Sequence, residues 1–194
     1  MRIVGGSLSG RRFSGPRGDK TRPTSERVRE ALSSALDARG LIRDRRVLDL
    51  FAGTGALAFE ALSRGARDAV LVEKAPAVAK AIERSARELG LEARTRVIVA
   101  DLLRADTKRW LEALAEPVEL VLIDPPYAEI ARVEFLLSTL AREGKLAPDA
   151  TVVIEHARRD PPTLPIGFSE ISSYRYGDTS IVLATFTPSQ DTHS

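Results

Sequence analysis

From Arg46 onwards the chain alternates short apolar runs with amphipathic stretches, and this alternation limits the folds that it can adopt. Strands that alternate with helices form a parallel sheet that helices cover on both faces, with right-handed crossovers. We therefore predict an α/β fold. The predicted strands are residues 47–50, 69–73, 96–100, 118–123 and 150–155, and the predicted helices are 54–64, 76–89, 107–115 and 130–143.

The end of the chain departs from this alternation. Residues 168–175 and 179–186 are two runs with a hydrophobic period of two, joined by the turn signal Tyr176-Gly177-Asp178. We expect this hairpin to add an antiparallel ending to the parallel sheet. The sequence leaves open whether Tyr174 and Tyr176 border a binding pocket.

The predicted strand 118–123 ends in Asp124-Pro125-Pro126-Tyr127, a turn that suits the methylation of an exocyclic amino group. The lone pair of such a nitrogen is delocalised into its ring, so the amine must be held with that pair facing an electrophilic methyl group. A carboxylate and a backbone carbonyl can accept both amino hydrogens, two prolines stiffen the turn, and a tyrosine ring can stack on the base. We predict Asp124, Pro125, Pro126 and Tyr127 as the catalytic residues.

A glycine-rich loop, Gly53-Thr54-Gly55, lies between the first strand of the predicted sheet and the next helix. Its spacing also fits a dinucleotide-binding loop, with the acidic Glu73 twenty residues after Gly53. A dinucleotide places an anionic pyrophosphate at the helix N-terminus, where Asp49 would repel it. S-adenosylmethionine carries an ammonium and a sulfonium group instead, so the charge of Asp49 favours this cofactor.

Four carboxylates follow or end successive strands of the predicted sheet: Asp49, Glu73, Asp101 and Asp124. The carboxyl ends of parallel strands meet at one edge, where open α/β sheets bind ligands. We expect Glu73 to accept both ribose hydroxyls of the cofactor and Asp101 to contact its adenine. The predicted cofactor-binding residues are Asp49, Phe51, Ala52, Gly53, Thr54, Gly55, Glu73, Lys74, Asp101 and Leu102.

Positive charge is concentrated at the start of the chain. Residues 1–46 carry twelve Arg or Lys against five Asp or Glu, a net charge of +7, whereas the rest carries seventeen against twenty-two, a net charge of −5. Such asymmetry indicates a polyanionic partner for the basic part. We predict a small β-hairpin in a basic RNA-binding extension, residues 1–23. The predicted RNA-contacting residues are Arg2, Arg11, Arg12, Arg17, Lys20, Arg22 and Arg27.

Composition argues against disulfides, metal centres, membrane helices and a signal peptide. The chain has no cysteine and only two histidines, so we expect neither a disulfide nor a metal centre. No apolar run approaches the roughly 20 residues that a membrane helix needs, and the first residues lack the apolar core of a signal peptide. We expect a cytoplasmic monomer without a membrane partner. Its main domain is predicted at residues 24–188, with Thr24 as the cap of the first helix, and residues 189–194 are predicted to form a flexible tail.

Several of these segments together resemble those of a known family. They are Arg2-Ile3-Val4-Gly5-Gly6 with Gly10-Arg11-Arg12, residues 21–30, residues 49–55, Asp124-Pro125-Pro126-Tyr127 and Tyr176-Gly177-Asp178-Thr179. The chain resembles class I S-adenosylmethionine-dependent methyltransferases, and more narrowly the bacterial family that methylates the N2 amino group of a guanine in 16S ribosomal RNA. The resemblance implies a Rossmann-like fold with a seven-stranded, mostly parallel sheet whose last strand is antiparallel. It also implies S-adenosylmethionine as cofactor and the small ribosomal subunit as partner.

Three alternatives explain part of the sequence. An amino-methyltransferase that acts on adenine or cytosine in DNA would also carry the Asp124–Tyr127 turn, although no separate target-recognition domain is evident. A dinucleotide-dependent oxidoreductase explains Gly53 and Gly55 but not that turn. A catalytically inactive RNA-binding protein explains the basic start of the chain but not the four carboxylates.

Overall fold

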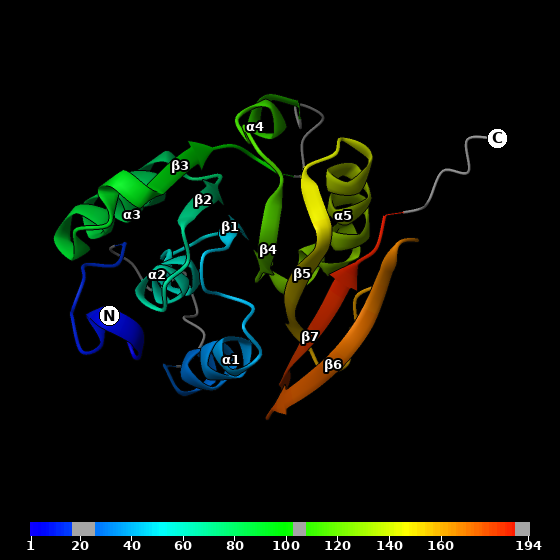
Figure 1. Ribbon diagram of the computed structural model, residues 1–194, viewed down its shortest axis with the longest axis horizontal. Coiled ribbons are helices and arrows are strands. Elements are labelled where there is room, and N and C mark those ends of the chain that lie inside the picture. Colours follow the sequence, from blue (N-terminus) through cyan, green and yellow to red (C-terminus); the bar gives the residue numbers. More distant parts are fainter. Residues whose placement is uncertain (17–25, 103–107, 189–194) are drawn as a thin grey trace.

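A computed structural model of the chain describes residues 1–16, 26–102 and 108–188. Its seven strands form one sheet in the order β3-β2-β1-β4-β5-β7-β6 (Figure 1). Strands β1 to β5 pair in parallel, whereas β7 pairs antiparallel with both β5 and β6, as the sequence predicted. The strands are β1 (Arg46–Leu50), β2 (Asp68–Glu73), β3 (Thr95–Val99), β4 (Val118–Ile123), β5 (Leu146–Ala157), β6 (Phe168–Tyr176) and β7 (Thr179–Phe186).

Helices cover both faces of the sheet and create two cores. Leu71 and Leu122 belong to the first core, which includes residues of α1, α2 and α3, whereas their neighbours Val72 and Val121 belong to the second core, with α4 and α5. This division follows from the two-residue period of a strand. The helices are α1 (Glu26–Ala38), α2 (Ala56–Ser63), α3 (Pro76–Leu89), α4 (Lys108–Glu112) and α5 (Val133–Arg142), with 3-10 turns η1 (Gly6–Leu8), η2 (Glu92–Arg94) and η3 (Tyr127–Arg132).

The strand order reverses direction beside β1. The chain proceeds outward from β1 to β2 and β3, then returns to place β4 on the other side of β1. Such a reversal opens a crevice at the carboxyl ends of the strands, where ligands of open α/β sheets bind. Residues 51–55 follow β1 and residues 124–127 follow β4, so both sequence motifs lie at this point.

Some element boundaries differ from the predicted ones. Helix α2 begins at Ala56 rather than at residue 54, since Gly55 adopts a left-handed conformation that ends the loop. The predicted helix 130–143 is divided into η3 and α5, and the predicted helix 107–115 is the shorter α4. Strand β5 is longer than predicted because Leu146 pairs with Val118 of β4 and the last residues pair with β7.

Residues 1–16 pack against α2 and α3 and form a short hairpin, in which the N–H of Ile3 donates to the carbonyl of Arg11 and the N–H of Phe13 donates to that of Met1. Arg2 and Arg12 pair in a single antiparallel bridge, with η1 in the turn between them. Ile3 and Phe13 are buried in the first core, and the Phe13 ring meets Phe59 edge-on with centroids 5.4 Å apart. Both apolar burial and backbone pairing thus hold the segment in place. The predicted boundary at residue 23, the cap at residue 24 and the tail 189–194 fall outside the described residues.

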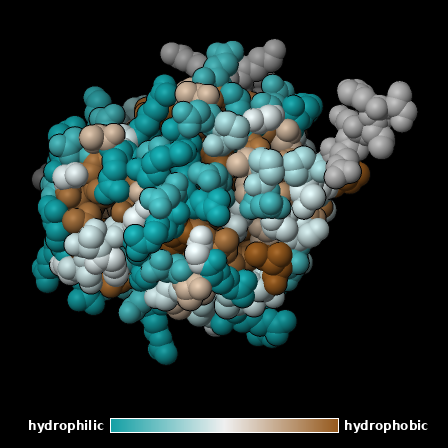
Figure 2. Space-filling view, viewed as in Figure 1, coloured by the Kyte–Doolittle hydropathy of each residue, from teal (hydrophilic) through white to brown (hydrophobic). Residues whose placement is uncertain are grey.

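The surface of the molecule is mainly hydrophilic on the side that Figure 2 shows, with hydrophobic residues in small separate groups. Within the described ranges, no helix is long and apolar enough to cross a membrane. Those ranges also contain no group of three or more His, Asp or Glu side chains that could hold a metal ion.

Candidate active site

Three of the predicted acidic residues lie together around the end of β1. Asp49 of β1 pairs with Leu71 of β2 and with Leu122 of β4. Glu73 and Asp124 come two residues after these partners, so the strand period directs them to the same face of the sheet. Their negative charges both act on Asp49. The register of three parallel strands therefore brings together carboxylates that are far apart in the sequence.

Asp49 is a buried acid in an unfavourable environment. Its side chain is 2% exposed, and its pKa is raised to about 8. Burial is the largest cause, the carboxylate of Asp124 and, less strongly, that of Glu73 act in the same direction, and the backbone N–H of Ala58 in α2 opposes them. The Oδ2 atom of Asp49 has no hydrogen-bond donor among the described residues. A buried acceptor without a donor is costly, so a cationic group bound here would be favourable.

The glycine loop is held against the end of β2. The backbone N–H of Gly53 donates to Oε2 of Glu73 at 3.0 Å, and the N–H of Ala52 donates to the carbonyl of Val72 at 3.0 Å. Ala52 is buried, while Gly53 and Thr54 are half-buried. These bonds fix the loop over the acidic cluster, with part of its backbone accessible.

Three residues of the loop, Phe51, Gly53 and Gly55, adopt a left-handed backbone conformation. Gly55 has a φ of 74°, and a Cβ atom at this position would lie 2.9 Å from the Phe59 ring. Glycine is therefore required there by both conformation and packing. Phe51 has a φ of 63°, which is uncommon for a residue with a side chain. Nothing in the sequence indicated this strained position.

Glu73 is held in place by a second backbone donor. Its Oε1 atom accepts the N–H of Ala75 at 2.8 Å. Each oxygen of a carboxylate can accept more than one hydrogen bond, so Glu73 keeps acceptor capacity for the hydroxyls of a ligand. Beyond it, Lys74 is exposed and Asp101 is half-buried, whereas Leu102 is buried in the second core.

The turn after β4 is rigid and lies next to this cluster. Asp124 is half-buried, Pro125 is buried and Pro126 is exposed. The carbonyl of Pro126 accepts the N–H of Glu129 at 2.7 Å, which closes the turn at the start of η3. Because each proline ring fixes φ, the direction of Asp124 is well defined. Tyr127 begins η3, but its side chain is outside the described part of the structure, so its stacking role stays a prediction.

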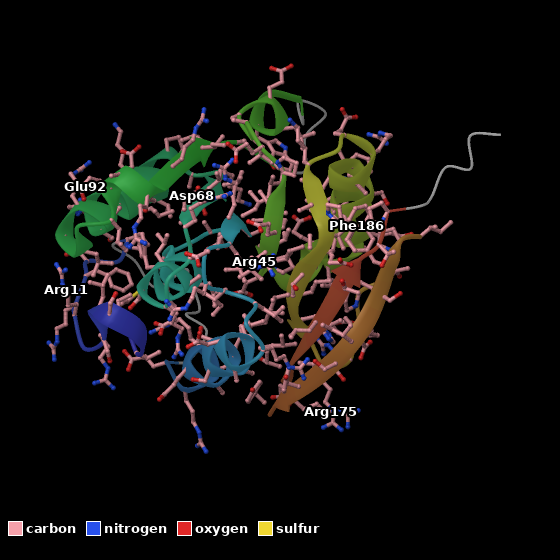
Figure 3. The ribbon with its side chains drawn as sticks, in the orientation of Figure 1. Arg11, Arg45, Asp68, Glu92, Arg175 and Phe186 are labelled. Atoms are coloured by element: carbon pink, nitrogen blue, oxygen red, sulfur yellow. The ribbon has the colours of Figure 1, made fainter. Side chains whose placement is uncertain are left out.

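The predicted RNA-contacting arginines are not equally available. Both terminal nitrogens of Arg11 donate to carbonyls at the end of α3, at 2.8 Å to Leu89 and 2.6 Å to Glu88 (Figure 3). Arg2 pairs with Glu26 at 2.9 Å. Arg11 thus anchors the N-terminal segment to α3. Among the others, Arg12 and Arg27 are exposed, and Arg17, Lys20 and Arg22 lie outside the described residues.

A buried ion pair that the sequence analysis did not identify also fixes the N-terminal segment. Arg29 of α1 and Glu60 of α2 are 1% and 0% exposed, with 3.7 Å between Nε and Oε2. Arg29 donates to the carbonyl of Arg2 at 2.8 Å, and Glu60 accepts the N–H of Val4 at 3.0 Å. The signal was the spacing of Arg29 to Leu32, which places the arginine on the apolar stripe of the helix.

Known proteins are similar in sequence to this chain over most of its length. The family described as "Conserved hypothetical protein 95" matches residues 1–185. The chain is 33% identical over 170 residues to ribosomal RNA small subunit methyltransferase D of Escherichia coli strain K12, covering 87% of this chain and 81% of that protein. The chain therefore belongs to this family. It is also 32% identical over 161 residues to the putative rRNA methyltransferase YlbH of Bacillus subtilis strain 168, covering 81% and 83%.

Solved structures resemble this chain over nearly its whole length. A putative methyltransferase yhhF from Escherichia coli superposes with a TM-score of 0.81 at 30% identity, covering 97% of this chain and 98% of that one. A hypothetical protein of Thermus thermophilus has a TM-score of 0.74 at 32% identity, covering 94% and 98%. The Rossmann-like methyltransferase fold and the family resemblance are confirmed, and the chain is a methyltransferase.

Proposed function

We propose that this protein transfers a methyl group from S-adenosylmethionine to the N2 amino group of a guanine in the 16S rRNA of the small ribosomal subunit. The observation that carries the proposal is the buried Oδ2 of Asp49, which has no partner in the described part of the chain and lies near Asp124 at the carboxyl edge of the sheet. It supports a binding site for a cation next to a turn suited to an amine. The names of the relatives in E. coli and B. subtilis support rRNA as the acceptor.

S-adenosylmethionine is the cofactor, and it supplies a methyl group already activated on a positively charged sulfur. Asp49 would hold its ammonium group, since the buried Oδ2 of this acid has no donor among the described residues. Glu73 would accept the ribose hydroxyls with the capacity left by Gly53 and Ala75. Asp101, at the end of β3, would contact the adenine. Each role uses a residue that the fold already holds in place.

The acceptor base would enter the site beside the Asp124–Tyr127 turn. Removing a base from its stack costs a few kcal/mol, and stacking on Tyr127 would return about 1 to 3 kcal/mol. Asp124 and the carbonyl of Pro125 would accept the two amino hydrogens and so orient the nitrogen. Orientation of this kind can contribute about 7 to 11 kcal/mol to catalysis. A strong general base is unnecessary, because the nitrogen becomes acidic once it is methylated.

A comparison of Asp124→Ala with the wild type tests this assignment. The variant should bind S-adenosylmethionine at least as tightly as the wild type in a thermal-shift titration, because the carboxylates of Asp49 and Glu73 remain and loss of the Asp124 charge lowers the pKa of Asp49. Methyl transfer to small subunits from cells that lack the enzyme should fall below detection. Near-normal transfer by the variant would remove Asp124 from its role.

The second candidate acceptor is an amino group of adenine or cytosine in DNA, since the same turn is known from enzymes of that class. Labelled methyl transfer to small-subunit rRNA and to duplex DNA, measured side by side, separates the two. Label in the rRNA alone supports the proposal, and label in the DNA alone contradicts it.

A further inference from the structure

The tip of the β6–β7 hairpin lies at the same edge of the sheet as Asp124. Strand β7 begins there and is antiparallel to both of its neighbours, so β5 and β6 end there. One row of paired residues crosses the three strands, from Ala157 through Thr179 to Tyr176. The tip is three strand spacings from β4, which is about 14 Å. An RNA strand that delivers a base to Asp124 can therefore reach this tip.

Two tyrosines of β6 face the same side of the sheet as the acidic cluster. Tyr174 pairs with Ile181, which belongs to the first core together with Leu122. Tyr176 is two residues further along the strand and shares that face. Both rings are half-buried and pack against the first core, so each is supported from below and retains an accessible part. Burial raises the pKa of Tyr176, with a contribution from Tyr174, so this phenol stays neutral.

Exposed arginines lie beside these tyrosines. The guanidinium carbon of Arg39, just after α1, is 6.0 Å from the centroid of the Tyr174 ring. The backbone N–H of Arg158 donates to the carbonyl of Asp178 at 2.9 Å, which fixes the residue after β5 against the hairpin turn. Figure 3 shows Arg175 at the same tip. Arg158 and Arg175 (Figure 3) thus flank Asp178 in the hairpin turn, and Arg39 lies over the Tyr174 ring.

We propose that Arg39, Arg158, Tyr174 and Tyr176, which we call the hairpin surface, bind a nucleotide adjacent to the target guanine. The inference rests on the proposed function. Aromatic rings that stack single-stranded bases, together with arginines that neutralise phosphates, are the chemistry by which proteins hold unpaired RNA. The hairpin surface offers aromatic rings and arginines close enough to the flipped base to contact a neighbouring nucleotide. It would form a second contact, separate from the N-terminal segment.

Tyr176 allows a test that separates stacking from folding. Tyr176→Phe keeps the ring, whereas Tyr176→Leu keeps an apolar side chain at this half-buried position and removes the stacking face. With naked 16S rRNA as the probe, Tyr176→Leu should weaken binding about tenfold, and Tyr176→Phe should stay within about twofold of the wild type. Arg158→Ala should lower the slope of log affinity against log salt by about 0.7.

Arg142→Ala is the matched control for the charge change. Arg142 is an exposed arginine in the last turn of α5, which precedes β5 and so lies at the opposite edge of the sheet. This variant should bind RNA like the wild type, and every variant should bind S-adenosylmethionine normally.

Two results would overturn the hairpin surface while leaving the proposed function intact. One is wild-type affinity for naked RNA in Tyr176→Leu. The other is a loss of binding by that variant to assembled small subunits alone, which would assign the surface to a ribosomal protein. If the wild-type enzyme neither binds nor methylates small-subunit rRNA, the proposed function fails and this inference fails with it.

Discussion

Replacing Asp49 by asparagine should remove a pH dependence from cofactor binding. In the protein without ligand, burial and two neighbouring carboxylates raise the pKa of Asp49 to about 8. Below that pH the acid is mostly protonated and neutral. An ammonium group prefers the ionised form, so binding must release the proton. The affinity for S-adenosylmethionine should therefore rise with pH until Asp49 ionises without help.

The size of this effect follows from the proton that is released. One proton lost on binding gives a tenfold change in affinity per pH unit, or about 1.4 kcal/mol. Between pH 6 and pH 7 the dissociation constant should fall about tenfold, since both values lie below the pKa of Asp49. An α-amino group itself deprotonates near pH 8, so the comparison should stop at about pH 7.5.

Isothermal titration calorimetry in two buffers of different ionisation enthalpy measures both the affinity and the proton release. The wild type should release close to one proton at pH 6.5, and Asp49→Asn should bind more weakly with no proton release. An affinity of the wild type that is constant from pH 6 to pH 7.5, or an equal proton release by the asparagine variant, would refute the role of Asp49.

Three further predictions concern stability. Without cofactor, the wild type should lose stability relative to Asp49→Asn as the pH rises from about 4 to about 8. The reason is that the Asp49 carboxyl ionises near 3.9 in the unfolded chain but keeps its proton when buried. A difference in melting temperature between the two proteins that stays constant over this pH range would contradict the prediction. Gly55→Ala should cost more than Gly90→Ala by about 1 to 3 kcal/mol in urea unfolding, as both have positive φ but only Gly55 meets a ring; equal costs would show that the ring yields. Arg29→Ala should cost about 1 to 3 kcal/mol, because Glu60 keeps Arg64 at 3.3 Å but loses its second cation, and the carbonyl of Arg2 loses its donor, against about 0.5 kcal/mol or less for the exposed Arg142→Ala; similar values would mean that the buried pair adds little.

The acidic cluster was predictable because strand geometry is local and parallel topology is restrictive. Asp49, Glu73 and Asp124 each end or follow an apolar run, and parallel strands place such ends at one edge. The antiparallel ending was equally visible in the two alternating runs around Gly177. In both cases a short stretch of sequence determines the feature, and the topology then brings the stretches together.

Features that depend on packing between distant elements were not predictable. Arg29 and Glu60 meet because α1 lies against α2, and neither helix alone indicates the other. The N-terminal segment was predicted as a hairpin and its arms do pair, but the burial of Ile3 and Phe13 in the first core was not predicted. Arg11 was predicted for RNA, and its contact with the end of α3 follows from that docking.

The most direct test of the account is the identity of the methylated atom. Small ribosomal subunits from cells lacking the enzyme would be incubated with the purified protein and methyl-labelled S-adenosylmethionine, and the 16S rRNA digested to nucleosides for mass spectrometry. We predict that the label appears in N2-methylguanosine alone, at a single position in the RNA. Label in a methylated adenosine or cytidine, or on a carbon or ribose oxygen, would contradict the proposal that the Asp124–Tyr127 turn presents the amino group of guanine.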